Sequence, residues 1–150
     1  FGGSAQKGVE STVLISSDEG LQIGRLGAYS IAQLETITAI QFSDTKLTNK
    51  SPICPGQKYR HYAPCCLLTY DSDYKQNYDA ILGFKGRDYD SSSKVFCLGD
   101  LNKPEELLSN LYKKLRELDQ QGCQQAWIDS DFPQTGLYQT LHERLKKAAS

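Results

Sequence analysis

The residues best suited to chemistry in this chain lie in one short segment, residues 55–64, which reads PGQKYRHYAP. Lys58 and Arg60 carry charges that can bind phosphate groups, and the imidazole of His61 can gain or lose a proton near neutral pH. The two tyrosine rings of the segment can stack on a nucleobase. Flanking prolines favour an extended backbone. From the residues alone, the segment is either a nucleotide contact or a solvated linker whose charges are incidental.

The segment ends a longer stretch that shows no sign of secondary structure. Residues 42–51 are polar and have no hydrophobic periodicity. Together with residues 52–64 they predict a linker of about 20 residues, and a loop of that length is unusual unless it is functional or disordered. The linker separates residues 1–41 from residues 65–150.

Before the linker, the pattern predicts two strands and a helix. Residues 9–16 are apolar and β-branched, and residues 21–27 form a second short run that ends in glycine. The apolar residues of 31–37 have helical spacing, with Ser30 as the N-cap. Two short strands cannot bury both of their faces, so we expect this part to be the end of a larger sheet.

After the linker, apolar runs alternate with helical patterns. Four runs predict strands, at residues 66–70, 78–84, 94–98 and 125–129. One helix begins at Pro104, carries a stripe of leucines and ends before Gly122, and a second helix with a leucine stripe runs from Thr135. Strands separated by helices favour a largely parallel sheet, so we expect a small Rossmann-like α/β fold.

Composition excludes several classes of protein. The net charge is −1, with 17 basic and 18 acidic residues, so no general nucleic-acid surface is predicted. No stretch approaches the roughly 20 apolar residues that a membrane span needs, and we expect a cytoplasmic protein. The chain begins with Phe1 rather than Met, and we expect it to be a piece of a longer protein.

The sequence predicts no metal site. The five cysteines form no Cys-x-x-Cys pair, and His61 and His142 lie apart from them. Aspartates in the predicted loops do not match the spacing of a calcium loop. We expect reduced thiols, with Cys65 and Cys66 in the core rather than in a redox pair, and we expect His142 at the surface of the last helix.

Three pieces of the chain, in order, resemble a known family. The motif PGQKYRHYAP resembles the linker of the long, two-domain form of threonylcarbamoyl-AMP synthase. Residues 8–13, GVESTV, resemble the strand that ends the YrdC-like catalytic domain of that family, and residues 101–149 resemble its C-terminal helix-strand-helix. The resemblance divides the chain into a remnant of the catalytic domain (1–41), the linker (42–64) and a C-terminal α/β domain (65–150).

The resemblance implies a reaction. Members of this family condense threonine, bicarbonate and ATP into threonylcarbamoyl-AMP and pyrophosphate, with Mg²⁺ in the enzyme. The product feeds threonylcarbamoyladenosine formation in tRNA. The implied partners are the catalytic N-terminal domain and the proteins that transfer the group to tRNA. The family's other ATP-binding residues are absent from this sequence, so we expect the chain alone to lack synthase activity.

The resemblance also implies roles for two residues before the linker. Ser11 matches the serine that contacts threonine, and Arg25 matches the arginine that meets the ATP phosphates. Around the arginine, the family usually has Arg-Pro-Gly, whereas this chain has Arg25-Leu26-Gly27. The loss of the proline loosens the turn. Without the resemblance, Ser11 reads as a strand serine bonded to neighbouring backbone, and Arg25 as a surface cation.

In the linker, the resemblance implies that Tyr59, His61 and above all Tyr62 contact the nucleotide. The segment would then fold over the cleft and shield the labile adenylate from water. Lys58 and Arg60 either clamp phosphate or hold the linker to an acidic surface.

Two other interpretations remain open. The chain could be a nucleotide-sensing or partner-docking module that regulates a catalytic domain elsewhere, using the crevice at the switch point of a parallel sheet. It could also be a scaffold domain without a ligand of its own.

Overall fold

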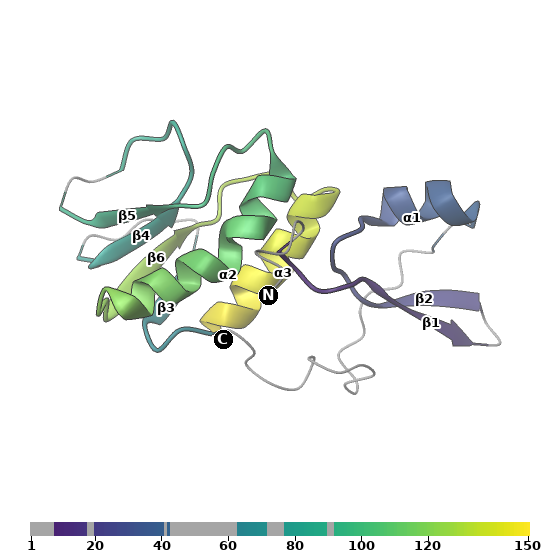
Figure 1. Cartoon of the computed structure of the whole chain (residues 1–150), viewed down its shortest axis with the longest axis horizontal. Coiled ribbons are helices and arrows are strands. Elements are labelled where there is room, and N and C mark those ends of the chain that lie inside the picture. Colours follow the sequence, from purple (N-terminus) through teal and green to yellow (C-terminus); the bar gives the residue numbers. More distant parts are fainter. Residues whose placement is uncertain (1–7, 18–19, 41, 43–62, 72–76, 90–91) are drawn as a thin grey trace, which may run out of the picture.

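The computed structural model describes residues 8–17, 20–40, 42, 63–71, 77–89 and 92–150, in two parts (Figure 1). The smaller part, before residue 43, contains a two-stranded antiparallel sheet and one helix. The larger part, after residue 62, contains a four-stranded parallel sheet and two helices. The α/β fold with a parallel sheet that the sequence predicts is confirmed.

The parallel sheet consists of β3 (Leu67–Asp71), β4 (Ala80–Gly83), β5 (Lys94–Cys97) and β6 (Gln125–Asp129). Its order is β3-β6-β4-β5, so the last strand in sequence lies between β3 and β4. Ala126 of β6 pairs with Leu68 on one side and with Ala80 on the other. All four predicted strands are present.

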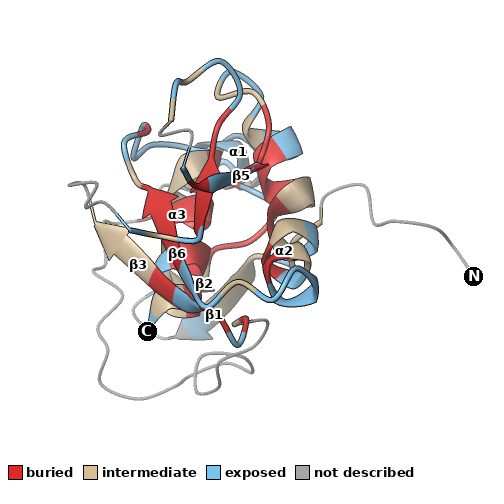
Figure 2. Ribbon diagram, turned by 90° about the vertical axis from the view of Figure 1, so that its left-hand side faces the viewer, coloured by how far each residue is buried: buried red, intermediate tan, exposed pale blue. Residues whose placement is uncertain are grey.

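Two helices, α2 (Pro104–Gln120) and α3 (Leu137–Ala149), pack on one face of this sheet. Figure 2 shows the buried residues gathered between the helices and the strands. The leucine stripes that predict the helices provide that core, and Gly122 has a φ of +69° where α2 ends, as expected for a glycine after a helix. The buried apolar residues of the helices are Leu107, Leu108, Leu111, Leu115 and Leu118 in α2, and Leu137, Leu141, Leu145 and Ala148 in α3.

No described helix covers the opposite face of the sheet, where loop residues pack instead. Gly83 points to this face, because its neighbours Leu82 and Phe84 belong to the core under the helices. A Cβ on Gly83 would lie 2.6 Å from the Tyr89 ring, so the loop after β4 packs directly on the strand. At the sheet's outer strands this face is open, since Leu67 is 62% and Val95 43% exposed.

The smaller part pairs β1 (Val13–Ser17) with β2 (Gly20–Arg25) and continues into α1 (Ile31–Thr38). Ser30 caps α1 as predicted, in a reciprocal capping box with Gln33. The first strand begins later than the sequence predicts, because Glu10 and Thr12 hydrogen-bond to the loop after β2 instead of continuing the hairpin ladder.

The expectation that His142 lies at the surface is wrong. Its side chain is buried and stacks on the Phe132 ring, with 3.8 Å between ring centroids. Nε2 lies 3.2 Å from the carbonyl oxygen of Pro133 and therefore carries the proton, so Nδ1 accepts a hydrogen bond from the Tyr70 hydroxyl. Burial lowers the pKa of His142, and nearby Lys146 lowers it further.

The four described cysteines are free thiols, as expected. Cys66 is buried, but Cys65 beside it is exposed, so the expectation that both lie in the core is half wrong. Their backbone amides donate to the Asp119 carboxylate of α2, which fixes the start of the larger part. Within the described ranges, no helix has the length and apolar character needed to cross a membrane.

Candidate functional site

Ser11 and Arg25 lie together in the structure. Ser11 precedes β1 and is exposed, and Arg25 ends β2, where it pairs with Val13. The guanidinium of Arg25 donates a hydrogen bond to the Ser11 carbonyl oxygen at 3.2 Å. Two residues that the sequence separates by 14 positions are therefore in contact, through the Arg25 guanidinium and the Ser11 backbone.

The Thr12 hydroxyl joins the two chain segments that carry these residues. It donates to the Tyr29 carbonyl oxygen at 2.8 Å and accepts from the amides of Gly27 and Tyr29 at 3.0 and 3.2 Å. The amide of Ala28 also donates to the Glu10 carbonyl oxygen at 3.0 Å. These bonds hold residues 10–12 against residues 27–29.

Gly27 allows this close approach. A Cβ at this position would lie 2.2 Å from the Glu10 carbonyl oxygen and 2.5 Å from the Thr12 amide nitrogen. Any other residue would push the two segments apart. The glycine of the Arg25-Leu26-Gly27 sequence is thus required by packing.

The linker residues expected to contact the nucleotide lie outside the described residues: Lys58, Tyr59, Arg60, His61 and Tyr62. Their roles remain predictions. Among the residues that the structure does describe, no group of three or more His, Cys, Asp or Glu side chains could hold a metal ion. Asp71, one residue beyond the strand predicted at residues 66–70, is the last residue of β3.

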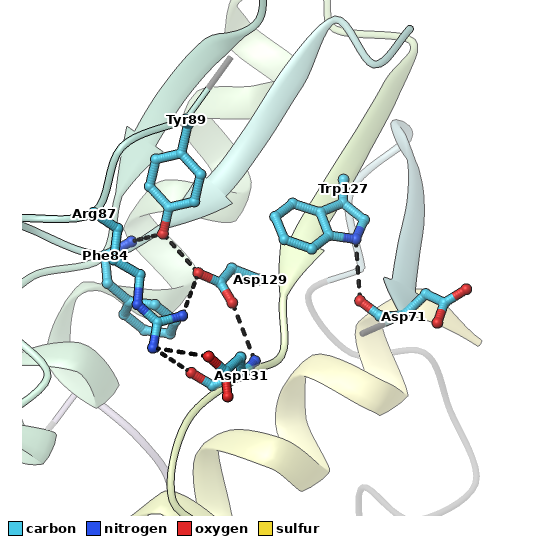
Figure 3. Close-up of polar contacts among 7 residues, drawn as sticks. All are labelled: Asp71, Phe84, Arg87, Tyr89, Trp127, Asp129 and Asp131. Carbon is cyan, nitrogen blue, oxygen red and sulfur yellow. Dashed lines mark hydrogen bonds and ion pairs between the residues drawn. The ribbon is translucent and has the colours of Figure 1, made fainter. Parts of the chain in front are cut away.

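A second constellation, at the carboxyl end of β6, was not found from the sequence. Asp129 is 3% exposed, and its Oδ2 accepts from Arg87 Nη1 and from the Tyr89 hydroxyl, each at 2.7 Å (Figure 3). Its Oδ1 accepts from the Asp131 amide at 3.0 Å. Burial and the bond to Asp129 raise the pKa of Tyr89 above its ordinary value.

The Asp129 carboxylate lies at the edge of the sheet where a switch-point ligand is expected, but the hydrogen-bond donors to it come from the protein itself. The Tyr89 hydroxyl also accepts from the Phe84 amide at 2.8 Å, so the loop after β4 is tied to β6 through one ring. We interpret the network as structural. Its only signal in the sequence is an aspartate that ends an apolar strand.

Comparison with known proteins decides the family. A family model described as "Threonylcarbamoyl-AMP synthase, C-terminal domain" matches residues 29–150. The chain belongs to this family. The resemblance of the chain to this family is therefore confirmed, and the match begins at residue 29, before the predicted linker.

Two relatives named threonylcarbamoyl-AMP synthase align with nearly the whole chain. The *Bacillus subtilis* protein is 30% identical over 169 residues, which cover 99% of this chain and 47% of the relative. The *Pyrococcus abyssi* protein is 28% identical over 165 residues, which cover 99% of this chain and 48% of the relative. The chain thus spans about half the length of the curated relatives it matches.

Two solved structures of *P. abyssi* Sua5 have the same fold. The crystal structure of that protein complexed with L-threonine gives a TM-score of 0.74 at 26% identity, covering 99% of this chain and 48% of the other. A variant with adjacent His and Tyr residues replaced by Ala gives a TM-score of 0.74 at 24% identity, covering 96% and 46%. The threonylcarbamoyl-AMP synthase fold therefore extends over both parts of this chain.

Proposed function

We propose that this chain is the C-terminal part of a threonylcarbamoyl-AMP synthase, a nucleotidyltransferase that joins threonine, bicarbonate and ATP into threonylcarbamoyl-AMP and pyrophosphate. The observation that carries the proposal is the likeness over 99% of the chain to *P. abyssi* Sua5 complexed with L-threonine. Family membership alone does not assign the reaction to this chain, because the chain spans about half of its relatives.

Ser11 binds threonine and Arg25 binds the ATP phosphates in this proposal. The contact between Arg25 and the Ser11 carbonyl supports a shared site, since it brings the Arg25 guanidinium to the backbone of Ser11. A guanidinium offers fixed, paired donors that match phosphate oxygens. The Ser11 hydroxyl can donate to a carboxylate and accept from an ammonium group, and threonine has both.

The linker forms a lid over the bound nucleotide in this proposal. Tyr59, His61 and Tyr62 contact the adenylate, and Lys58 and Arg60 lie near its phosphates or hold the linker in place. A lid has a physical purpose here, because threonylcarbamoyl-AMP hydrolyses readily and closure keeps water away from it.

Residues 1–41 would be the end of the catalytic domain, followed by the linker (42–64) and the C-terminal α/β domain (65–150). The exposed apolar surface of the smaller part supports this division. No residue of α1 is buried: Ile37 on this helix is 69% exposed, and Ile40, two residues beyond its end, is 44% exposed. A two-stranded sheet is also only marginally stable by itself. Both features fit a catalytic domain that continues upstream, so we propose that the chain alone has no synthase activity.

The product would pass to proteins that transfer the threonylcarbamoyl group to tRNA in the cytoplasm. We propose no direct tRNA surface, because the charges of the chain balance. The described residues offer no cluster of metal ligands, so we assign none of them to Mg²⁺ and derive no step through it.

Pyrophosphate release tests the proposal. The complete protein that contains this chain should release pyrophosphate only when threonine, bicarbonate and ATP are all present, and the chain alone should not. Ser11→Ala and Arg25→Lys should each lower kcat/KM by about tenfold or more. Ser16→Ala, at an exposed serine of the strand β1 that follows Ser11, is the matched control.

A calorimetric titration separates this function from the nucleotide-sensing alternative. ATP or AMP binding that is lost in Tyr62→Ala and Arg25→Ala variants supports a synthase site shared by the hairpin and the linker. Binding that survives deletion of all residues before Cys65 supports a sensing module in the larger part.

A further inference from the structure

The C-terminal helix α3 holds the loop that follows Arg25. Thr140 Oγ1 donates to the Gly27 carbonyl oxygen at 3.1 Å, and Arg144 Nη2 donates to the Leu26 carbonyl oxygen at 2.9 Å. Both side chains are buried, at 0% and 9% exposure. Figure 1 shows α3 on the side of the larger part that faces the smaller one. We call Thr140 and Arg144 the α3 clamp.

The α3 clamp also reaches the segment that carries Ser11. Arg144 forms an ion pair with Glu10 Oε2 at 3.2 Å, and the Tyr112 hydroxyl of α2 donates to the same oxygen at 3.1 Å. Burial acts to raise the pKa of Glu10, but its own backbone amide, Arg144 and Tyr112 outweigh burial and hold it below the ordinary value. Glu10 is therefore charged and fixed.

These contacts flank both candidate binding residues. Leu26 and Gly27 directly follow Arg25, and Glu10 directly precedes Ser11. The Gly27 backbone lies directly against residues 10–12, so a shift of one segment moves the other. One buried arginine thus connects the two segments that present Ser11 and Arg25.

The clamp fixes the two peptides that follow Arg25. Here the Leu26 and Gly27 carbonyl oxygens are fixed from outside by directional hydrogen bonds, one of them from a cation. Apolar packing alone would bury a comparable surface but would not fix the orientation of these two peptides.

We propose that Thr140 and Arg144 are positioning residues, through which the C-terminal domain orients Ser11 and Arg25 for threonine and ATP. This inference rests on the proposed function, since it concerns the same site. The C-terminal domain then contributes to substrate affinity through α3, without touching substrate.

The test measures local protection and kinetics on Thr140→Val and Arg144→Met. In the 150-residue chain, amide hydrogen exchange at residues 27–29 should accelerate by about tenfold, the change that the loss of one buried hydrogen bond allows. Exchange in β4 and β6 should stay as in the wild type, which shows that the variants are folded. Thr140→Ser keeps the hydroxyl and should restore protection.

In the complete protein, the same variants should raise the KM for threonine and for ATP by about three- to tenfold, with a smaller change in kcat. Arg116→Met, which removes an exposed cation from α2, is the control for lost charge and should leave both KM values unchanged.

The outcomes separate the two proposals. If the wild type is active and the clamp variants exchange faster but keep wild-type KM values, the contacts are only structural and the inference is overturned. It is also overturned if neither measurement changes. An inactive wild-type protein refutes the proposed function, and the substrate role of the clamp with it.

Discussion

Replacing Asp129 with Asn tests whether the network at the end of β6 stabilises the larger part. The side chain of Asp129 is 4% exposed, and its Oδ2 receives the hydrogen bonds from Arg87 and Tyr89. An Asn amide has one acceptor oxygen, which can keep the bond from the Asp131 amide, while its NH₂ group faces the donors of Arg87 and Tyr89. The substitution therefore removes the bond from Arg87 and exchanges the bond from Tyr89 to a charged group for a neutral one, because the Tyr89 hydroxyl can turn and accept from the NH₂ group. The size of the side chain does not change.

The expected loss follows from the kinds of bond. The loss of a bond to a charged group costs about 1.5–3 kcal/mol, and exchanging a second such bond for a neutral one costs about 1 kcal/mol more, which together suggest about 3 kcal/mol. The side chain of Arg87 is 30% exposed and can turn towards water, so its unpaired charge adds little to the loss of stability. For a chain of this size, ~3 kcal/mol lowers Tm by about 6–12 °C.

Urea unfolding followed by Trp fluorescence measures this loss. Trp127 is the only tryptophan, is 6% exposed and lies on the same strand as Asp129. Asp131→Asn is the matched control, because Asp131 contacts the same arginine at 3.4 Å but its side chain is 88% exposed. It should cost less than about 1 kcal/mol.

Removing the arginine should cost more than removing the carboxylate charge. Arg87→Met leaves Asp129 charged and buried, and breaking a buried ion pair by removing one partner typically costs about 3–5 kcal/mol of stability.

Two results would refute the assignment of stability to this network. One is a free energy of unfolding for Asp129→Asn within about 0.5 kcal/mol of the wild type, and the other is a larger loss in Asp131→Asn than in Asp129→Asn.

Three further measurements follow from buried groups. Because the pKa of His142 is lower in the folded protein, the unfolded chain binds a proton at higher pH, and the free energy of unfolding should fall below about pH 6.5 by at most about 1.4 kcal/mol per pH unit. In urea titrations from pH 8 to 5, His142→Phe should lose this pH dependence. A His142→Phe variant with the wild-type pH profile would contradict the account. Burial raises the pKa of Cys66 to about 11, so at pH 8 only about one thiolate in a thousand forms, and iodoacetamide should label exposed Cys65 well before Cys66 in a peptide mass analysis. Gly27→Ala should accelerate amide exchange at residues 27–29 because its Cβ meets the Glu10 carbonyl oxygen; wild-type exchange there would show that the close approach is not needed.

The sequence predicts the elements of the larger part well, because local patterns report burial. The leucine stripe of α2 and the apolar runs of β4 and β6 mark residues that are indeed buried. The order of the strands does not follow from these patterns. Nothing in the β6 sequence indicates that it pairs with β3 and β4, since a parallel neighbour is chosen by the crossover of α2.

The misplacement of His142 has a long-range cause. The residue follows Leu141 on the flank of a leucine stripe, where a polar side chain normally meets water. Phe132 and Tyr70 cover it from a loop and from β3, and the carbonyl oxygen of Pro133 accepts a hydrogen bond from its Nε2. Such cover depends on tertiary packing and leaves no periodic signal.

The same limit applies to the candidate site. The closeness of Ser11 and Arg25 follows from a hairpin, which the two predicted strands already suggest. The bond from Arg144 to the Leu26 carbonyl joins residues 118 positions apart and involves a backbone atom, so no residue pattern could indicate it. Sequence reasoning found the residues proposed to bind substrate and missed those that hold them.

The larger part should fold without the residues before Cys65. All buried members of its apolar core lie between Cys66 and Ala148, and among the described residues of the smaller part only Val9 packs against that core. In a chain of residues 65–150, Thr140 and Arg144 lose their carbonyl partners but gain contact with water, so neither is left buried and unpaired. We therefore expect a cooperative urea transition that is weaker by about 1–3 kcal/mol, from the lost contacts of Val9 and Glu10. Trp127 fluorescence follows it directly. A shortened chain that unfolds without cooperativity would show that residues 8–30 belong to the same folding unit, and that the proposed boundary at residue 64 divides the sequence but not the structure.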